Sequence, residues 1–337
     1  MPVRDAAPWL DESLGSIRDQ TDADWELLAV DDGSADASRS ILDQHASSDS
    51  RVQVLSTSPD RRGIVEALNR GLGVARAPLL ARMDADDLAH PARLAEQRRA
   101  LELDEGLFAT SCRVAAFGPE AVGEGMQRYL AWQNSLLTPG SIARDRFVES
   151  PVVHPSTMMR TGPLRDELGG WLERGWPEDW DLFLRAMERG MRIGRVDAEL
   201  MRWRLHDAQA TRSDERYGED RLLSVRAHYL ARELARVRSG RDVWILGSGP
   251  VGKMLCKALA REGMRCAALA DVDPRKIGGV IRDGASRWPV RAMEDLFAAT
   301  PRPYAVGAVG RPGGRNDIRG LMTSRGWRET DDYVVAA

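Results

Sequence analysis

The sequence predicts an α/β protein, in which a mixed, mostly parallel sheet is sandwiched by helices and followed by a second, smaller α/β domain. Two observations lead to this prediction. Short apolar segments alternate with amphipathic helical segments over the first hundred residues, and the alternation begins again after Ser239-Gly240. A chain of 337 residues with 43% hydrophobic residues is also long enough to build two cores. We therefore predict domains at residues 1–238 and 239–337.

The elements of the first domain follow from its periodicity. Apolar residues at helical spacing come after Pro8, which suits the first turn of a helix. A long charged helix is expected to close the domain, after a less regular stretch from 105 to 210. Between these we predict strands at 25–30, 52–55 and 79–83, and helices near 36–46, near 64–76 and from Pro91 onward.

The start of the chain departs from this pattern. It reads Met1-Pro2-Val3-Arg4-Asp5, with no strand before it. A parallel sheet of this type has a central strand directly upstream of such a segment. The expectation is therefore that the first strand of the domain is missing, through a truncated start or an initiator further upstream.

Charge and cysteine content argue against several classes of protein. The formal net charge of −3 is spread as mixed signs, so nucleic acid is not an expected partner. The three cysteines are far apart and fit neither a zinc site nor a disulfide framework. No run approaches the roughly 18 apolar residues of a membrane span, and the first residues do not resemble a signal peptide. A cytoplasmic location is therefore expected.

Two acidic clusters follow predicted strands. Asp84-Ala85-Asp86-Asp87 places carboxylates at i and i+2, and hard oxygen ligands of this kind suit Mg²⁺ or Mn²⁺ bridging two phosphates. Asp31-Asp32-Gly33-Ser34 offers a carboxylate to the base or ribose of a nucleotide. Either cluster by itself is also typical of an ordinary polar turn. Together, at strand ends where α/β sheets bind ligands, they favour a nucleotide site.

These clusters belong to a longer series of motifs. The series resembles the family 2 glycosyltransferases in order and spacing over about residues 1–212, and it reads Pro2-Val3-Arg4-Asp5, Val30-Asp31-Asp32-Gly33-Ser34, Gly63…Ala67-Leu68-Asn69-Arg70-Gly71, Met83-Asp84-Ala85-Asp86-Asp87 and Glu178-Asp179-Trp180-Asp181-Leu182. The resemblance implies a GT-A fold, a nucleotide-sugar donor, a divalent cation and inversion at the anomeric carbon.

The resemblance also implies roles for single residues of the donor site. Pro2, Val3 and Asp32 would line the nucleoside pocket, although Val3-Arg4 stands where the family usually has an aromatic residue after the proline. Asp84 would approach the ribose or donor sugar, and Asp86 would bind the metal. His206 resembles a histidine that completes the metal or diphosphate site in some relatives. Arg204 or Arg212 would neutralise the diphosphate.

On the acceptor side, Asp179 would act as the general base, with Glu178 as the second candidate. The alternative for this pair is that the two acids only stabilise the positive end of a helix. His154 is expected to shape the acceptor side, and the alternative for His206 is that of a packed or hydrogen-bonded structural residue. The expected acceptor is a glycan or a lipid-linked molecule, so peripheral contact with a membrane is compatible with the cytoplasmic location.

The second domain opens with a glycine-rich turn between a strand and a helix. Gly247, Gly249 and Gly252 form G-x-G-x-x-G, and Asp271 stands 24 residues beyond Gly247, near the place of a ribose-binding acid. This predicts a Rossmann-like fold that binds NAD(P) or another nucleotide, or else a scaffold that has lost its ligand. Strands are expected at 243–246, 265–270, 304–309 and 332–336, and helices at 250–262, 291–299 and 314–325.

The leading hypothesis is an inverting glycosyl transfer from a nucleotide diphosphate sugar to a hydroxyl acceptor, in surface polysaccharide or glycolipid synthesis. A nucleotidyltransferase is the rival enzyme, but it would normally show a basic, glycine-rich phosphate loop after its first strand. A nucleotide-sugar or dinucleotide-binding scaffold or sensor without turnover is the alternative from another class.

Overall fold

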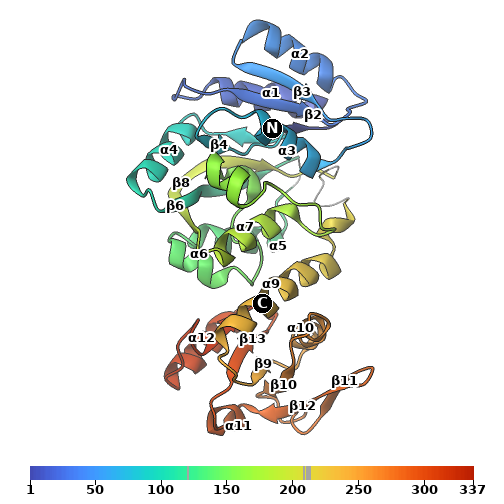
Figure 1. The fold of residues 1–337 in the computed structure, drawn as a ribbon, viewed down its shortest axis with the longest axis vertical. Coiled ribbons are helices and arrows are strands. Elements are labelled where there is room, and N and C mark those ends of the chain that lie inside the picture. The colour runs from blue at the N-terminus through green and yellow to red at the C-terminus, as the bar shows by residue number, and fades with distance from the viewer. Residues whose placement is uncertain (120, 208, 210–213) are drawn as a thin grey trace. The chain divides into compact units, whose positions relative to one another are not determined.

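The computed structural model describes residues 1–119, 121–207, 209 and 214–337 (Figure 1). The chain divides into two compact units. The first comprises Met1–Ala143, Pro151–Arg174 and Asp181–Asp214, and the second comprises Arg144–Ser150, Gly175–Trp180 and Glu215–Ala337. The long helix α9 (Glu219–Val237) and two short earlier segments thus group with the C-terminal residues. That residues 1–238 and 239–337 form separate domains remains a prediction.

The first unit begins with a parallel sheet of three strands, in the order β1 (Pro2–Val3), β2 (Leu27–Asp31) and β3 (Val52–Ser56). The helices between and after these strands are α1 (Ala7–Arg18), α2 (Ser38–Ser48) and α3 (Ile64–Val74). Helix α1 has proline in its first turn and buries Leu10, Leu14 and Ile17, the stripe expected from the sequence. The pairs β2–α2 and β3–α3 match the predicted alternation, and α1 lies where a helix was predicted around Pro8.

A mixed sheet of five strands follows in the same unit, in the order β4 (Leu79–Ala81), β7 (Met158–Arg160), β6 (Leu107–Phe117), β8 (Arg192–Arg204) and β5 (Leu88–Ala89). The long strands β6 and β8 are parallel, and the other pairs are antiparallel. The helices along this stretch are α4 (Arg93–Leu103), α5 (Glu124–Ser135), α6 (Pro139–Asp145) and α7 (Glu178–Glu188). The less regular part of the sequence therefore contains the two longest described strands, β6 and β8.

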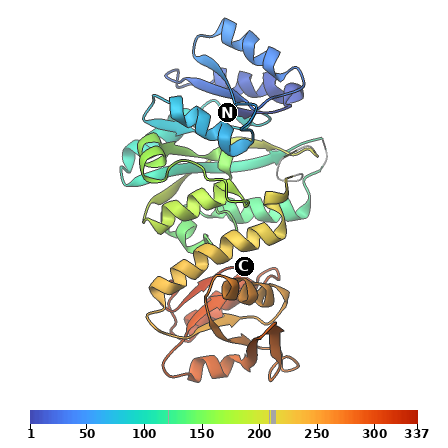
Figure 2. The same cartoon turned by 45° about the vertical axis from the view of Figure 1, so that its right-hand side comes forward.

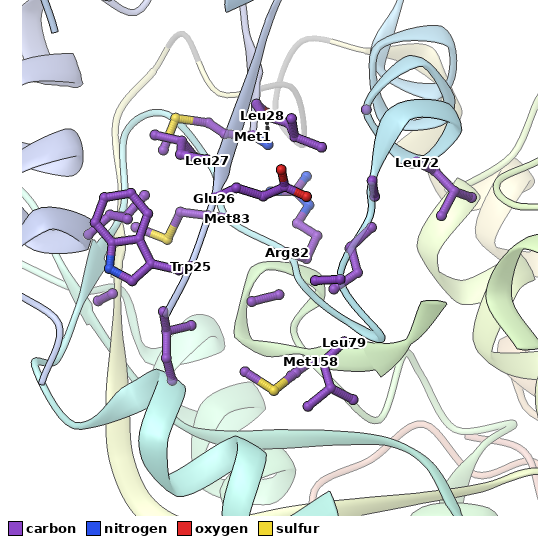
Figure 3. A pocket seen from close by; sticks show the side chains of 18 of the residues that line it. Met1, Trp25, Glu26, Leu27, Leu28, Leu72, Leu79, Arg82, Met83 and Met158 are labelled. Carbon is purple, nitrogen blue, oxygen red and sulfur yellow. Dashed lines mark hydrogen bonds between the residues drawn. The ribbon is translucent and has the colours of Figure 1, made fainter. Parts of the chain in front are cut away.

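The two sheets of the first unit both border one groove, of about 720 Å³. Its lining is mainly apolar, and Figure 3 shows Leu28 from β2, Leu79 from β4 and Leu72 from α3 around it. A single sheet was predicted here. The described strands form two sheets, because β1 pairs with β2 and β4 pairs with β7, and neither β1 nor β3 pairs with a strand of the second sheet. Pro2 and Val3 form the short strand β1, whereas the first strand of the domain was predicted to be missing.

The second unit contains a six-stranded sheet, in the order β11 (Val280–Asp283), β12 (Ser286–Ala292), β10 (Cys266–Asp271), β9 (Val243–Leu246), β13 (Tyr304–Gly307) and β14 (Tyr333–Val335). All its pairs are parallel except β11–β12. Its further helices are α10 (Pro250–Arg261), α11 (Met293–Ala298) and α12 (Gly314–Ser324), and Figure 2 shows them with the long helix α9 in yellow.

Four strands and three helices of this unit lie where the sequence predicts them, and the hairpin β11–β12 was not predicted. In the part of the chain that the structure describes, no helix has both the length and the apolar composition needed to cross a membrane.

Candidate functional site

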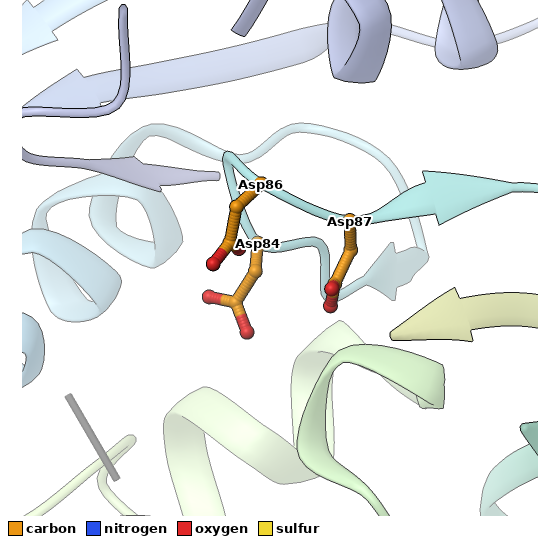
Figure 4. Close-up of side chains that lie close together, drawn as sticks. All are labelled: Asp84, Asp86 and Asp87. Carbon is orange, nitrogen blue, oxygen red and sulfur yellow. The ribbon is translucent and has the colours of Figure 1, made fainter. Parts of the chain in front are cut away.

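The acidic turn, residues 84–87, links β4 to β5 in the first unit. Oxygen atoms of Asp84, Asp86 and Asp87 lie within 4.8 Å of one another (Figure 4). Asp84 and Asp86 are partly exposed, whereas Asp87 is fully buried. The turn therefore presents two accessible carboxylates above a third that has no contact with solvent.

The end of strand β8 and helix α1 hold this turn in place. Asp87 Oδ1 accepts a hydrogen bond from the Arg204 amide at 2.9 Å, and Arg204 Nε donates to the Asp86 carbonyl at 2.7 Å. From the other side, Ser13 Oγ donates to the Asp84 carbonyl at 3.2 Å. Because both backbone and side chain are fixed, the three carboxylates cannot simply turn away from one another.

The electrostatics of the turn are unfavourable without a cation. Burial, followed by the charge of Asp84, raises the pKa of Asp86, and the hydrogen bond from His206 only partly opposes this. Burial and the charges of Asp84 and Asp86 raise the pKa of Asp87 well above its usual range. Among the described residues, Asp87 Oδ2 has no hydrogen-bond partner. Arg82 forms a buried ion pair with Asp84, which neutralises one of the three charges.

The residues at the turn fit a divalent cation. His206 Nε2 lies 2.8 Å from Asp86 Oδ2. Two ligands at right angles on a cation with bonds of about 2.1 Å lie about 3 Å apart, so this spacing suits neighbouring ligands of one ion. Carboxylate oxygens with one imidazole are donors that Mg²⁺ and Mn²⁺ accept. The close group of possible ligands in the described residues comprises Asp84, Asp86 and Asp87, and His206 contacts this group through Asp86.

Arg204, the predicted diphosphate partner, also lies at the turn. Its guanidinium pairs with Glu12 and lies 4.4 Å from the centre of the Phe117 ring. It is therefore next to Asp86, with part of its charge offset by Glu12. Arg212, the other residue considered for this role, is outside the described residues.

The predicted nucleoside residues meet at the carboxyl ends of β1 and β2. The Asp32 amide donates to the Val3 carbonyl at 2.8 Å, beside Pro2. The buried Asp32 carboxylate accepts hydrogen bonds from the Gly63 amide at 2.9 Å and from Thr57 Oγ1 at 2.9 Å. Arg4, which replaces the usual aromatic residue, lies 3.7 Å from it. Asp32 therefore ties three chain segments together, a role the sequence did not indicate.

Arg62 is a further residue of this region, and the sequence did not indicate it. Gly33 has φ +75°, and a Cβ placed on it would lie 2.6 Å from the Arg62 guanidinium carbon. The backbone conformation favours glycine, and a larger side chain would also require the flexible Arg62 guanidinium to move. The sequence holds one signal for this contact, which is the glycine at position 33 of the Asp-Asp-Gly-Ser motif.

Glu178 and Asp179 belong to the second unit, at the start of α7. Glu178 is buried, and its carboxylate accepts hydrogen bonds from the Tyr217 hydroxyl at 3.0 and 3.1 Å. Asp179 is partly exposed, and its Oδ1 accepts the Trp180 amide at 2.7 Å. Burial and then the charges of both acids raise the pKa of Tyr217 well above its usual range. Of the two acids, Asp179 is the more accessible.

His154 lies in the core of the first unit. Its Nε2 accepts a hydrogen bond from the Trp171 indole at 3.0 Å, and burial lowers its pKa well below the usual range. The histidine is therefore neutral and packed in the core, and its burial gives no support to the predicted role on the acceptor side.

The glycine loop of the second unit follows β9. Gly247 has φ +101°, and a Cβ on Gly252 would lie 1.9 Å from the Gly247 carbonyl oxygen. Both glycines are thus required for the helix to pack on the strand, whereas the space at Gly249 would admit a side chain. The loop has the strand–turn–helix context predicted for it.

Asp271 closes this loop. Its carboxylate accepts hydrogen bonds from the Ser248 amide at 2.8 Å, the Ser248 hydroxyl and the Asp273 amide at 2.9 Å, and it lies 3.3 Å from Lys276 Nζ. Although burial opposes it, these hydrogen bonds lower the pKa of Asp271 to about 2. Asp271, the residue predicted to bind a ribose, is thus already hydrogen-bonded to the glycine loop and to the residues that follow β10.

Comparison with known proteins gives the first unit a family. The model of "Glycosyl transferase family 2" matches residues 1–168. TuaG of Bacillus subtilis, named as a teichuronic acid biosynthesis glycosyltransferase, is 31% identical over 51% of this chain and 68% of its own. EpsE of the same organism is 32% identical over 54% of this chain and 63% of its own. An uncharacterized glycosyltransferase of Haemophilus influenzae is 27% identical over 61% of this chain. The match spans 64% of that relative, so it and EpsE are covered over less than two thirds of their length.

Solved structures agree on the fold. TarS 1–349 of S. aureus, in complex with UDP-GlcNAc, has a TM-score of 0.54 at 16% identity and covers 77% of this chain and 78% of its own. At this identity the likeness shows the fold alone, which is the GT-A type with its mixed, parallel-rich sheets between helices. The motif series, the family model and the relatives converge, and the chain belongs to the family 2 glycosyltransferases.

Proposed function

We propose that the chain is a metal-dependent, inverting glycosyltransferase that moves a sugar from a nucleoside diphosphate sugar to a hydroxyl group of a glycan or lipid-linked acceptor. The observation that carries this proposal is the acidic turn: three carboxylates gather beside His206, in a member of a glycosyltransferase family. The names of TuaG and of the O-antigen biosynthesis protein RfbC of Myxococcus xanthus, 29% identical over 72% of this chain, support surface polysaccharide as the product.

The donor side of the reaction is assigned to the first unit. Asp86 and His206 hold the cation, and Asp84 lies toward the donor sugar. A bound Mn²⁺ or Mg²⁺ supplies the positive charge that stabilises a leaving diphosphate. Arg204 adds a guanidinium beside Asp86. Pro2, Val3 and Asp32 shape the nucleoside pocket, with Arg4 in place of an aromatic ring.

The acceptor side is assigned to Asp179. Its carboxylate removes the proton from the acceptor hydroxyl while the hydroxyl oxygen forms a bond to the anomeric carbon. The bond from that carbon to the diphosphate oxygen breaks on the opposite face, so the configuration inverts and no covalent enzyme intermediate forms. Glu178, held by Tyr217, positions the start of α7.

The test is a panel of nucleoside diphosphate sugars with Mn²⁺ or Mg²⁺, scored by release of the nucleoside diphosphate with and without added acceptor. Asp86→Ala should abolish release, and Asp197→Ala, an exposed acid on β8, should leave it unchanged. A protein that binds donor but releases no product with any sugar or metal would overturn the enzyme assignment in favour of a sensor. Full turnover by Asp86→Ala would overturn the metal assignment.

For the second unit we propose a nucleotide ligand, NAD(P) or a nucleotide sugar, at the glycine loop. The support is the strand–glycine–helix arrangement with Asp271 at the next strand end. Titration with NAD(H) and with nucleoside diphosphate sugars, followed by the melting temperature, tests it. Absence of any shift at millimolar ligand would favour a scaffold, because the glycines and Asp271 also have packing roles.

A further inference from the structure

One face of helix α1 supports the acidic turn. Trp9, Glu12 and Ser13 are spaced i, i+3 and i+4, so they lie on the same side of the helix. The Trp9 indole is stacked on the His206 imidazole, with ring centres 3.9 Å apart and planes at 24°. Glu12 pairs with Arg204, and Ser13 donates to the Asp84 carbonyl. Each contact reaches the turn or the segment beside it.

The same helix begins at the predicted nucleoside segment. The Ala6 amide donates to Ser38 Oγ at 2.8 Å, and the Ala7 amide donates to Asp36 Oδ2 at 3.0 Å. Asp5 Oδ1 accepts the Ala35 amide at 2.7 Å. The start of α1 is thus bound to the loop after β2, while its side face is bound to the acidic turn.

The position of the His206 ring depends on Trp9. The hydrogen bond to Asp86 fixes one atom of the imidazole, Nε2, but leaves its plane free to rotate about that contact. Nδ1 is buried and has no hydrogen-bond partner among the described residues. Among the described residues, the stacked indole of Trp9 is therefore the contact that sets the plane of the ring. Aromatic stacking contributes about 0.5–1.5 kcal/mol beyond buried area.

We propose that Trp9 is a positioning residue of the metal site: its indole holds the His206 imidazole in the plane in which Nε2 and the Asp86 carboxylate bind the same divalent cation. This inference rests on the metal site of the proposed function. It assigns α1 a second task besides packing, because Trp9 also contacts the apolar core of the unit.

The test is Mn²⁺ binding to the full-length protein, measured by the electron paramagnetic resonance signal of free Mn²⁺, without donor or acceptor. Trp9→Leu keeps apolar bulk but removes the aromatic face, and should weaken binding about 3- to 10-fold. Trp9→Phe keeps a face for stacking and should stay within about twofold of the wild type. Melting curves without metal identify any loss of folding.

A double-mutant cycle separates positioning from packing. In the His206→Ala background, Trp9→Leu should cause no further loss of Mn²⁺ affinity, because the ring that it positions is gone. Equal Mn²⁺ binding by wild type and Trp9→Leu, or the same loss in both backgrounds, would overturn the role of Trp9 and leave the metal site standing. A wild-type protein that binds no Mn²⁺ would overturn the metal site itself.

Discussion

The acidic turn of the first unit and the glycine loop of the second both present aspartates at the end of a β-strand, and their surroundings differ. In the turn, the carboxylates of Asp86 and Asp87 lie beside that of Asp84, and their pKa values are raised. In the loop, the Asp271 carboxylate accepts hydrogen bonds from its own chain, and its pKa is lowered to about 2.

The difference distinguishes a group of carboxylates that a bound cation would stabilise from a carboxylate that the fold already satisfies. Carboxylates that are held together against their repulsion destabilise the fold, and such clusters occur where a ligand restores the balance. A carboxylate that the fold itself satisfies needs no ligand. The dipeptide Glu178-Asp179 repeats the contrast, since Glu178 is buried and held by Tyr217 while Asp179 is partly exposed.

The largest expected effect concerns that dipeptide. Asp179→Asn should lower kcat about 10²- to 10⁴-fold, as the loss of a general base does, with little change in KM for the donor. Glu178→Gln keeps an acceptor for the Tyr217 hydroxyl and should lower kcat less than tenfold. Steady-state rates of nucleoside diphosphate release measure both. A larger loss of kcat in Glu178→Gln than in Asp179→Asn would assign the general base to Glu178. It would also contradict the contrast between buried and accessible carboxylates.

Asp271→Asn should destabilise the second unit by about 2 kcal/mol, because hydrogen bonds to a charged group contribute about 1.5–3 kcal/mol. Urea unfolding monitored by the amide signals of this unit measures the change. Asp283→Asn, at a partly exposed acid of β11 that pairs with Lys257, is the matched control and should stay within about 0.5 kcal/mol. An unchanged stability of Asp271→Asn would remove the contrast between loop and turn.

Asp87→Asn should affect stability in the opposite direction from Asp271→Asn. It should stabilise the metal-free protein by about 1 kcal/mol. The amide oxygen still accepts the Arg204 amide, and the amide nitrogen donates to the neighbouring carboxylates instead of repelling them. Saturating Mn²⁺ should reduce this gain, since the cation relieves the same repulsion. Melting temperatures with and without Mn²⁺ measure it. A destabilised variant would show that the Asp87 charge is already balanced.

The smallest expected effect is a change in how the free energy of unfolding depends on pH. The folded-state pKa of Asp271 lies below its unfolded value, so its contribution to stability is present above pH 4 and is lost as the pH falls toward about 2. The stability difference between wild type and Asp271→Asn should therefore shrink over this range. Unfolding curves at stepwise lower pH measure it, and a difference that grows on acidification would contradict the assignment.

The sequence predicts much of this fold because most elements carry local signals. Pro8 begins α1, and the apolar stripe of α1 is visible in the sequence. The hairpin β11–β12 was missed because Pro289 interrupts it, although Trp288 and Val290 show the alternation of a half-buried strand. The division of the first unit into two sheets depends on strand pairing, which no local pattern encodes.

For the candidate site, the motifs and the family resemblance were enough to select Asp84, Asp86 and His206 as residues of one site. The sequence could not identify the residues that hold this site in place, because contacts such as the stacking of Trp9 on His206 join residues that are far apart in the chain. Nor could it show that Asp87 Oδ2 is buried with no hydrogen-bond partner among the described residues, or that Asp271 accepts hydrogen bonds from Ser248. These properties arise from tertiary packing, which residue type alone does not fix.

The groove between β2 and β4 has a consequence for local opening of the first unit. The amides of Val30 and Asp32 donate to the carbonyls of Met1 and Val3, and the Leu28 amide, at the same alternation, lies on the edge of β2 that lines the groove. Hydrogen exchange reports such differences within one strand. We expect the Leu28 amide to exchange faster than that of Val30, two residues further along β2. An extended peptide that pairs with this edge would protect Leu28 first, which makes its amide a reporter of strand addition.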